Sequence, residues 1–297
     1  MTGRTEKILF HHSVKGESHK RKGTVCQDAS DSRADGDCRF IMAAVADGHG
    51  DPTCLRSDRG SVIAVSVALD CLQIFGESYA TREMILADSE DGDGRSALRQ
   101  LTDAIVSRWS AAVRENIQED PLTEEELVRS GPYEEYYREG EYLERVYGST
   151  LVAALEGDDY LLLLQQGDGR CDLLYEDGTM DAPIPPDERC YDNVTTSLAD
   201  DEASREIRSV LLSQGDERPA ACFLSSDGVE NGFYDDAGRI DFTVGAGQEL
   251  VQRQDEPVSE VLRPLLDHVS EYGNGDDVSL AGWIDARVWE GAAASVE

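Results

Sequence analysis

Five aspartates are candidates for chemistry, because each lies at the boundary of an apolar run and four of them have a glycine as neighbour. They are Asp28 in "CQDAS", Asp47 in "VADGHG", Asp168 in "QQGDGR", Asp227 in "LSSDGVEN" and Asp276 in "NGDDVS". A single Asp-Gly pair is an ordinary turn signal. If the strand ends converge, however, five carboxylates would repel one another unless a hard divalent cation, which prefers oxygen ligands, lay among them. The pattern therefore indicates a magnesium or manganese site.

Two residues after Asp47 fit such a site. Gly48 has no β-carbon, so its backbone carbonyl can approach an ion closely. His49 follows directly in the same loop. A loop histidine taken alone is more often structural than catalytic, so its interpretation depends on the other motifs.

The acids are separated by segments with regular apolar patterns. Short apolar runs predict strands over residues 40–46, 149–155, 160–166, 171–175, 221–226 and 278–284. Helical spacing of apolar residues predicts helices over 60–75, 96–118 and 255–272. Pro264 is expected to interrupt or shift the last helix. Layers of strands with helices on their outer faces satisfy this pattern, and no internal repeat or long linker divides the chain, so we favour one domain.

Two segments do not fit the regular pattern. Residues 119–148 place five tyrosines among glutamates, which favours a solvated, partly helical excursion, with a lid that docks a partner as the alternative. Residues 177–209 are rich in Pro, Asp and Thr. Long irregular stretches in compact domains are often functional, so we expect this segment to be a flap.

The charge balance narrows the classes of partner. The 297 residues include 27 Lys and Arg against 61 Asp and Glu, a formal net charge of −34. Such a chain is not expected to bind nucleic acid or an anionic membrane surface. All the lysines precede Gln27, so the one basic concentration is "KGESHKRKG".

The cysteines and the apolar runs bear on the compartment. Seven cysteines, with no C-x-x-C pair, suggest neither a disulfide framework nor a zinc knuckle. No apolar run approaches the roughly 18 to 20 residues that cross a bilayer, and the first residues lack the apolar core of a secretion signal. We therefore expect a cytoplasmic protein with no membrane partner.

Taken in order, the motifs resemble those of a known family. "QDAS", "VADGHG", "YGSTLVAAL", "QQGDGR", "LSSDGVENG" and "GDDVSLAGWI" are similar to motifs of the metal-dependent serine/threonine protein phosphatases of type 2C, the PPM family. The opening "GESHKRKGTVCQDA" resembles a bacterial branch of that family. The resemblance implies an α+β fold, a four-layer α-β-β-α sandwich of two antiparallel sheets flanked by helix pairs. It implies a single domain over 1–285 and a short tail over 286–297.

The resemblance also implies a ligand set. By motif position Asp47 would bridge two ions, the carbonyl of Gly48 would bind one of them, and Asp227 and Asp276 would complete the shell. Asp28 would act at one remove, through water.

Two further acids have weaker assignments by the same resemblance. The first aspartate of "DDVS" matches the family ligand, so Asp277 is a second choice behind Asp276. Asp168 matches an acid that helps to hold a third, looser ion.

The implied chemistry is phosphate ester hydrolysis. Two Mn²⁺ or Mg²⁺ ions share a water or hydroxide, lower its pKa toward neutrality and present it in line with the phosphorus, without a phosphoenzyme. His49 would give a proton to the departing serine or threonine oxygen.

The sequence departs from the family pattern at several positions. Gly23 stands where many members have an arginine that holds the substrate phosphate. The nearby candidates for that function are His19, Arg21 and Lys22, although a solvated basic cluster is the simpler interpretation. Gln27, Gly169 and Asn231 also differ from the more usual residues. No departure removes a proposed ligand, so we expect an active enzyme.

The expected function is metal-dependent hydrolysis of phosphoserine and phosphothreonine in proteins. A weakly active or inactive relative that serves as a phosphoprotein-binding or signalling module is the alternative, and a small-molecule phosphoesterase is a third interpretation, since fold alone does not choose among them. We expect a monomer whose partners are a phosphorylated protein substrate and a cognate Ser/Thr kinase.

Overall fold

The computed structural model describes residues 7–37, 39–88, 92, 94–191, 194–215 and 218–296. Within these residues the strands form two five-stranded sheets, and every pair of neighbouring strands is antiparallel. The first sheet has the order β1 (Lys7–Val14), β10 (Val278–Asp285), β9 (Pro219–Ser225), β6 (Arg170–Tyr175) and β7 (Met180–Asp181). The second has the order β2 (Asp28–Ala34), β3 (Ile41–Asp47), β4 (Leu151–Glu156), β5 (Tyr160–Gln166) and β8 (Arg208–Ser213).

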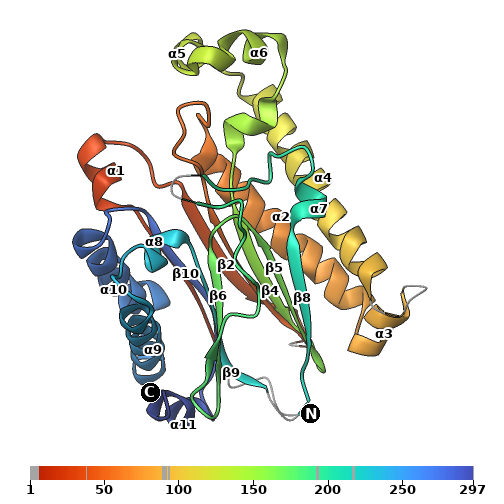
Figure 1. Ribbon diagram of the computed structural model, residues 1–297, viewed down its shortest axis with the longest axis vertical. Helices are drawn as coiled ribbons and strands as arrows, with labels where there is room; N and C mark the ends of the chain where they lie inside the picture. The colour runs from red at the N-terminus through yellow and green to blue at the C-terminus, as the bar shows by residue number, and fades with distance from the viewer. Residues whose placement is uncertain are drawn as a thin grey trace.

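Helices cover the outer face of each sheet (Figure 1). The second sheet is covered by α2 (Ser57–Ser78) and α4 (Arg95–Glu119), and the first by α9 (Asp236–Gln252), α10 (Val258–Tyr272) and α11 (Trp289–Ala294). Short helices lie in the connections: α1 (Glu17–Lys22), α3 (Arg82–Ala87), α5 (Glu124–Arg129), η1 (Gly131–Tyr133), α6 (Glu134–Glu139), η2 (Leu143–Tyr147), α7 (Ala203–Glu206) and α8 (Asp227–Glu230). The predicted four-layer sandwich is confirmed.

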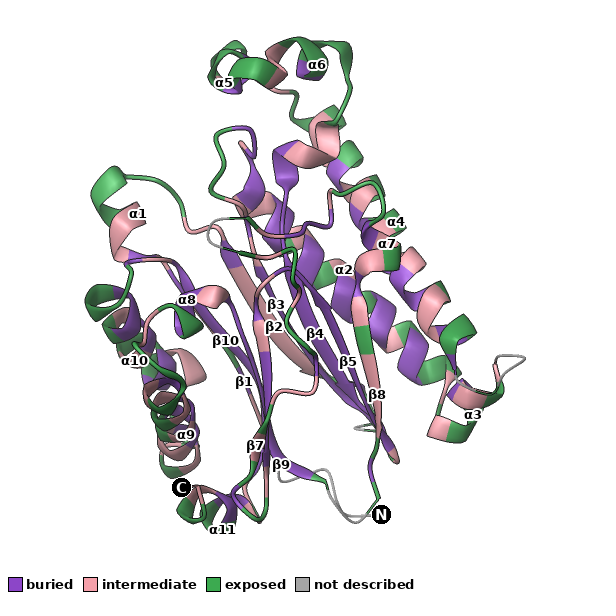
Figure 2. Ribbon diagram, in the orientation of Figure 1, coloured by how far each residue is buried: buried purple, intermediate pink, exposed green. Residues whose placement is uncertain are grey.

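The apolar side chains form one layer between the sheets and one beneath each helical cover. Every residue of β4, β5, β9 and β10 is buried, as Figure 2 shows for the inner strands. A strand of a sandwich core with helices outside has no solvent face, which is why its sequence is continuously apolar instead of alternating.

Helix α2 corrects one expectation from the sequence. By length and composition it could cross a membrane, whereas we expected no apolar run of that size. Of the apolar stretch, 56% is buried within the structure, and α2 packs on β2, β3 and β4. A helix in a protein core can have the same length and apolar composition as a membrane-spanning helix. The packing of α2 against the second sheet therefore accounts for its apolar sequence.

Two further expectations differ from the structure. Helix α10 runs through Pro264 without interruption, because Pro264 lies on the exposed side of the helix, where solvent can reach the carbonyl that loses its donor. The expected tail over 286–297 includes helix α11, whose Trp289 and Ala292 are fully buried against the first sheet and α9. The packed fold therefore extends beyond residue 285.

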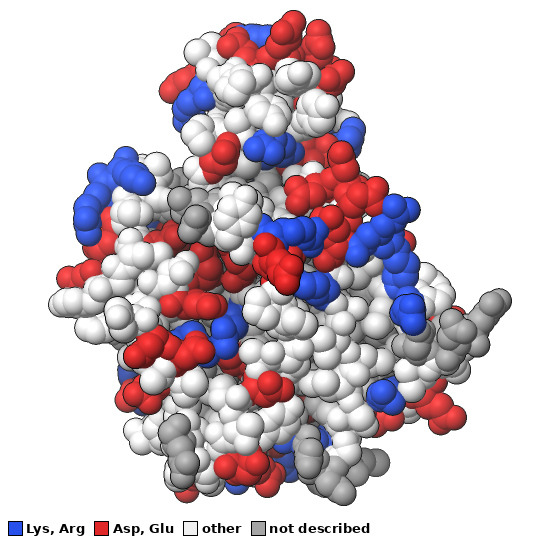
Figure 3. Space-filling view, viewed as in Figure 1, with Lys and Arg blue, Asp and Glu red and all other residues white. Residues whose placement is uncertain are grey.

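Residues 119–148, which we call the insertion, form α5, η1, α6 and η2 and project from one end of the sandwich (Figure 1). The outer side is exposed and acidic (Figures 2 and 3). Leu127 and Tyr137 are buried on its inner side. At its base Arg56, 4% exposed, donates from Nε to Glu126 Oε1 at 2.7 Å. The insertion is thus folded and anchored, and its outer side is solvated as expected.

The expected flap, 177–209, contains β7, α7 and the first residues of β8; residues 192 and 193 lie outside the described part of the chain. Arg208 of β8 donates to Gly167 O at 2.6 Å and to Pro185 O. The first bond ties the flap to the turn that carries Asp168, and the second links two parts of the flap.

Candidate active site

The topology brings the five aspartates to one end of the sandwich. Asp28 and Asp47 lie directly opposite each other at the ends of β2 and β3 in the second sheet. Asp227 follows β9 and Asp276 precedes β10, and these strands are antiparallel neighbours in the first sheet. Asp168 lies in the turn where the chain crosses from β5 to β6, and so from one sheet to the other. Each sheet therefore supplies two acids, and the crossing turn supplies the fifth.

Glycines let the acidic loops approach one another closely. A β-carbon on Gly48 would lie 2.4 Å from the carbonyl oxygen of Ser57, and one on Gly228 would lie 2.0 Å from that of Asp277. No other residue fits either position without moving the backbone. At these positions glycine is already required by loop packing, beyond any approach to an ion.

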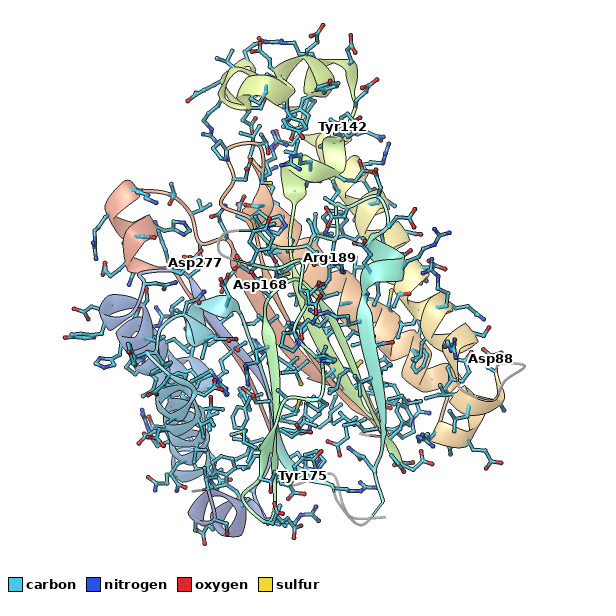
Figure 4. All side chains as sticks on the ribbon, in the orientation of Figure 1. Asp88, Tyr142, Asp168, Tyr175, Arg189 and Asp277 are labelled. Atoms are coloured by element: carbon cyan, nitrogen blue, oxygen red, sulfur yellow. The ribbon has the colours of Figure 1, made fainter. Side chains whose placement is uncertain are left out.

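The acids face a common cleft of about 1250 Å³. Asp47, Asp168, Asp227 and Asp276 line it, and Asp28 is buried behind them. The insertion contributes further lining residues, and Figure 4 shows the labelled Tyr142 above the end of the sandwich that carries Asp168 and Asp277. The flap also contributes to the wall, from Val194 to Asp201 with one interruption, as do α1, α4 and the loop after Asp47. Both irregular segments of the sequence thus border the cleft.

The carboxylates hold their protons more tightly than free aspartates do. Burial, with Asp277 next, raises the pKa of Asp28 to about 8. Burial, with the charges of Asp168 and Asp276, raises the pKa of Asp227 to about 7. Burial also raises the pKa of Asp47, and the neighbouring acids raise it further. Negative charge is therefore concentrated here, and His19 and Lys22 partly offset it at Asp276.

The donor set fits a divalent cation. Asp28 Oδ1 and Asp227 Oδ1 are buried without a hydrogen-bond partner, and unsatisfied carboxylate oxygens are costly unless a cation or donor meets them. As the side chains stand, the described residues include no group of three His, Cys, Asp or Glu side chains close enough to hold a metal ion.

The two aspartates of "DDVS" have different environments. Asp277 is 3% exposed and accepts hydrogen bonds from Gly16 N and Gln27 N, both at 2.6 Å, and from His19 Nδ1 at 2.9 Å. Asp276 lines the cleft, and its pKa is raised mainly by burial. Asp277, the second choice as a ligand, therefore has both oxygens engaged by the protein, and Asp276 is the one that faces the cleft.

His49 lies in the cleft with its Nε2 buried and without a partner. Its backbone N donates to Gly148 O at 3.0 Å, which fixes the loop. Burial, followed by the positive charge of Arg145, lowers the pKa of His49 to about 4. The ring is therefore neutral near pH 7 until a negative charge lies beside it.

The basic candidates near the amino terminus are only partly brought to the site. His19 and Lys22 of α1 line the cleft, whereas Arg21 is exposed and does not. The Nδ1 of His19 is engaged by Asp277. Of the three, Arg21 is not part of the cleft wall.

One cleft residue escaped the sequence analysis. Arg145 of η2 lines the cleft beside His49, yet in the sequence it is one arginine among many glutamates and belongs to no motif. The only available signal was its position three residues before "GST", which leads directly into β4.

Comparisons with known proteins agree with this geometry. The family model described as protein phosphatase 2C matches residues 15–279. Among solved structures, PppA, a key regulatory component of T6SS in Pseudomonas aeruginosa, is 20% identical, with a TM-score of 0.52 over 94% of this chain and 98% of that one. The catalytic domain of the serine/threonine protein phosphatase PstP, in complex with two manganese ions, is 18% identical, with a TM-score of 0.50 over 94% and 97%.

A third solved structure, a C. elegans sex determining protein, is 16% identical, with a TM-score of 0.57 over 97% of this chain and 68% of that one. At these identities the likenesses show the fold. A search of the curated proteins gave no match. The family match spans most of the chain, however, and the acids of its motifs line one cleft, so the chain belongs to the protein phosphatase 2C family, the metal-dependent protein-serine/threonine phosphatases.

Proposed function

We propose that this chain hydrolyses phosphoserine and phosphothreonine in proteins by direct, metal-dependent attack of water, with no phosphoenzyme intermediate. Asp47, Asp227, Asp276 and the carbonyl of Gly48 would hold two Mn²⁺ or Mg²⁺ ions. When bound, these ions supply the positive charge that makes water a nucleophile near neutral pH and that offsets the charge of the phosphate.

Two acids have supporting roles in this proposal. Asp28 is 7% exposed, and its Oδ2 accepts a hydrogen bond from Ser226 Oγ at 2.7 Å. Its Oδ1 has no hydrogen-bond partner, as suits a carboxylate that acts through water. Asp168 lines the cleft beside Asp227 and would hold a third, looser ion.

The observation that carries the proposal is the pair of buried carboxylate oxygens without donors, Asp28 Oδ1 and Asp227 Oδ1. They come from the second and the first sheet, respectively, and lie 199 positions apart in the sequence (227 minus 28). A chain that buries such oxygens at one end of its fold stabilises them with a cation.

His49 would protonate the departing serine or threonine oxygen. Its unpartnered Nε2 and its place in the cleft suit a group that meets the substrate. Because burial and Arg145 both favour the neutral ring, the role requires the phosphate dianion to raise the pKa of His49 when substrate binds.

The direct test is hydrolysis of p-nitrophenyl phosphate and of a phosphothreonine peptide, with manganese, with magnesium and with chelator. We expect turnover that requires a divalent cation and is lost in Asp227→Asn. The matched control is Asp70→Asn, an exposed carboxylate of α2 that pairs with Arg33, which should retain activity. Calorimetry with Mn²⁺ should show weaker binding in Asp227→Asn alone.

The test also addresses the alternative function. Wild-type protein that binds manganese, binds a phosphopeptide and hydrolyses neither substrate would be a phosphoprotein-binding module of this fold. Turnover of p-nitrophenyl phosphate and of small phosphomonoesters, but of no phosphopeptide, would favour the small-molecule phosphoesterase.

A further inference from the structure

Arg145 has a free hydrogen-bonding edge in the cleft. Its Nε donates to Thr53 Oγ1 at 3.0 Å, and its guanidinium lies over the ring of Tyr133 at 4.7 Å. Among the described residues, its two terminal nitrogens have no hydrogen bond or ion pair. The guanidinium is therefore held in place from one edge and one face, with its other edge available.

Most other arginines around the insertion are paired; the exception among the described residues is Arg129 of α5, which is exposed and does not line the cleft. Arg56 pairs with Glu126 at 2.7 Å, Arg114 with Glu144 at 2.6 Å, and Arg138 with Glu124 at 2.8 Å. With 61 acids against 27 bases in the chain, carboxylate partners are plentiful. Of the two described arginines that line the cleft, Arg114 has a carboxylate partner and Arg145 has none, so the guanidinium of Arg145 is the one available to a ligand.

The charge of Arg145 acts on two nearby acids, Asp51 and Asp200, but the described residues show no ion pair between either acid and the guanidinium. Asp51 accepts hydrogen bonds from Thr53 N at 2.8 Å and from the Thr53 hydroxyl. Asp200 accepts from Ser197 N at 2.8 Å. Thr53 thus donates to Asp51 and accepts from Arg145, a chain of hydrogen bonds that orients the guanidinium and leaves its two terminal nitrogens available.

The backbone fixes Arg145 beside the catalytic loop. Gly148 N donates to Arg145 O, and His49 N donates to Gly148 O, each at 3.0 Å. Arg56 N also bonds Val146 O at 2.9 Å. The η2 turn therefore holds Arg145 two hydrogen bonds away from His49, on a base that the core supports.

A guanidinium edge with two free nitrogens matches the paired oxygens of a phosphate, which it can bind through two parallel hydrogen bonds. We propose that Arg145 binds the phosphate group of the substrate, so that the insertion forms part of the active site. This inference rests on the proposed function, because it places the phosphate of a phosphomonoester in the same cleft as the metal ligands.

The test compares Arg145→Ala and Arg145→Lys with Arg114→Ala. Arg114 carries the same charge at the same cleft, but its side chain is engaged by Glu144 and is 57% exposed. The probe is inorganic phosphate, titrated into manganese-loaded protein at about 0.15 M salt to limit long-range electrostatics. The readouts are calorimetric affinity and the phosphate-induced rise in Tm.

We expect Arg145→Ala to weaken phosphate binding about tenfold or more, since a charge-assisted pair of hydrogen bonds is lost. The phosphate affinity of Arg145→Lys should lie between those of the wild type and Arg145→Ala, because an ammonium keeps the charge but cannot form the bidentate contact. Arg114→Ala should change the affinity less than about twofold. With p-nitrophenyl phosphate, the increase in KM should follow the phosphate affinity.

Unchanged phosphate affinity in Arg145→Ala, or an equal loss in Arg114→Ala, would overturn the assignment. If Arg145→Ala fails to fold, as judged by circular dichroism, Arg145→Lys decides the question on the same readouts. Failure of the proposed function is seen separately, as wild-type protein without turnover, and the phosphate titration tests Arg145 in that case as well.

Discussion

Asp276 and Asp277 are adjacent in the sequence but differ in what their carboxylates contact. Asp277 accepts bonds from the loop before β2 and from α1, so it joins three segments that must meet for the site to form. Asp276 faces the cleft and the other acids. One of these residues supports the fold, and the other supports the ion.

This difference predicts opposite outcomes for two isosteric changes. Asp277→Asn removes one of the acceptor oxygens and should lower the free energy of unfolding by about 1–3 kcal/mol without metal. Asp276→Asn removes repulsion and should leave the metal-free stability unchanged or higher, while it reduces stabilisation by Mn²⁺. Thermal melts of both variants, with and without Mn²⁺, measure this. Equal behaviour of the two would contradict the assignment.

A second prediction for a single residue concerns His49. In His49→Ala the loss of kcat/KM should reach about 100-fold or more on a phosphothreonine peptide, because an alkoxide leaves poorly without a proton. On p-nitrophenyl phosphate, whose leaving group needs no proton, the loss should be below about tenfold. Steady-state kinetics with both substrates decides; equal losses would reject a proton-donor role.

Among the elements, the insertion depends on the contact between Arg56 and Glu126. Arg56 is 4% exposed and donates to Glu126 and to the carbonyls of Asp120 and Pro121. Glu126 also completes a capping box with Thr123 at the start of α5. A single carboxylate therefore caps the helix and neutralises the buried guanidinium.

Glu126→Gln should lower the free energy of unfolding by about 1–3 kcal/mol at pH 7, because a charged partner of Arg56 is removed. Hydrogen bonding to Arg56 lowers the pKa of Glu126 from 4.5 to about 2. A lowered pKa means that the contribution is complete above pH 4.5 and is lost as the pH falls toward 2. The Tm difference between wild type and variant should therefore narrow below pH 4.5.

Glu124→Gln is the control, since Glu124 pairs with Arg138 on the surface and is 79% exposed. Its Tm should stay close to that of the wild type at every pH. A Glu126→Gln difference that stays constant across the pH range would contradict the ion pair.

The elements that the sequence predicted are those with unambiguous patterns. The continuously apolar strands β3, β4, β5, β9 and β10 are where the sequence placed them, because only a core strand tolerates such a run. β1 and β2 were missed, since "KILFHHSV" and "DASDSRA" are partly polar edge strands. Helix α9 was missed because its three glycines weaken the helical signal.

The sequence predicted those parts of the site that lie within local motifs. The aspartates were found because glycine and strand ends mark them, and they do line one cleft or lie behind it. Which of Asp276 and Asp277 faces the cleft depends on donors from residues 16, 19 and 27, which are distant in the sequence. Arg145 was not predictable, because its importance comes from the lack of a partner, which only the folded chain reveals.

For the whole molecule, metal binding should stabilise the fold. Clustered acids with raised pKa values oppose folding while no cation is present. Mn²⁺ at about 100 times its Kd should add about 2.7 kcal/mol to the free energy of unfolding, and chelator should remove it. Scanning calorimetry measures the difference, with Asp227→Asn as the variant that should not respond. A wild-type Tm that Mn²⁺ leaves unchanged would contradict a shared site.

The ligands are divided between the sheets: Asp28 and Asp47 lie in one, whereas Asp227 follows β9 and Asp276 precedes β10 of the other. The distance between the two pairs is then set by the thickness of the apolar layer that separates them, which includes the fully buried Ala154. Cation affinity thus reports on interior packing far from any ligand. A larger side chain at such a position would push the sheets apart and weaken cation binding, although every catalytic group in the sequence would be unchanged.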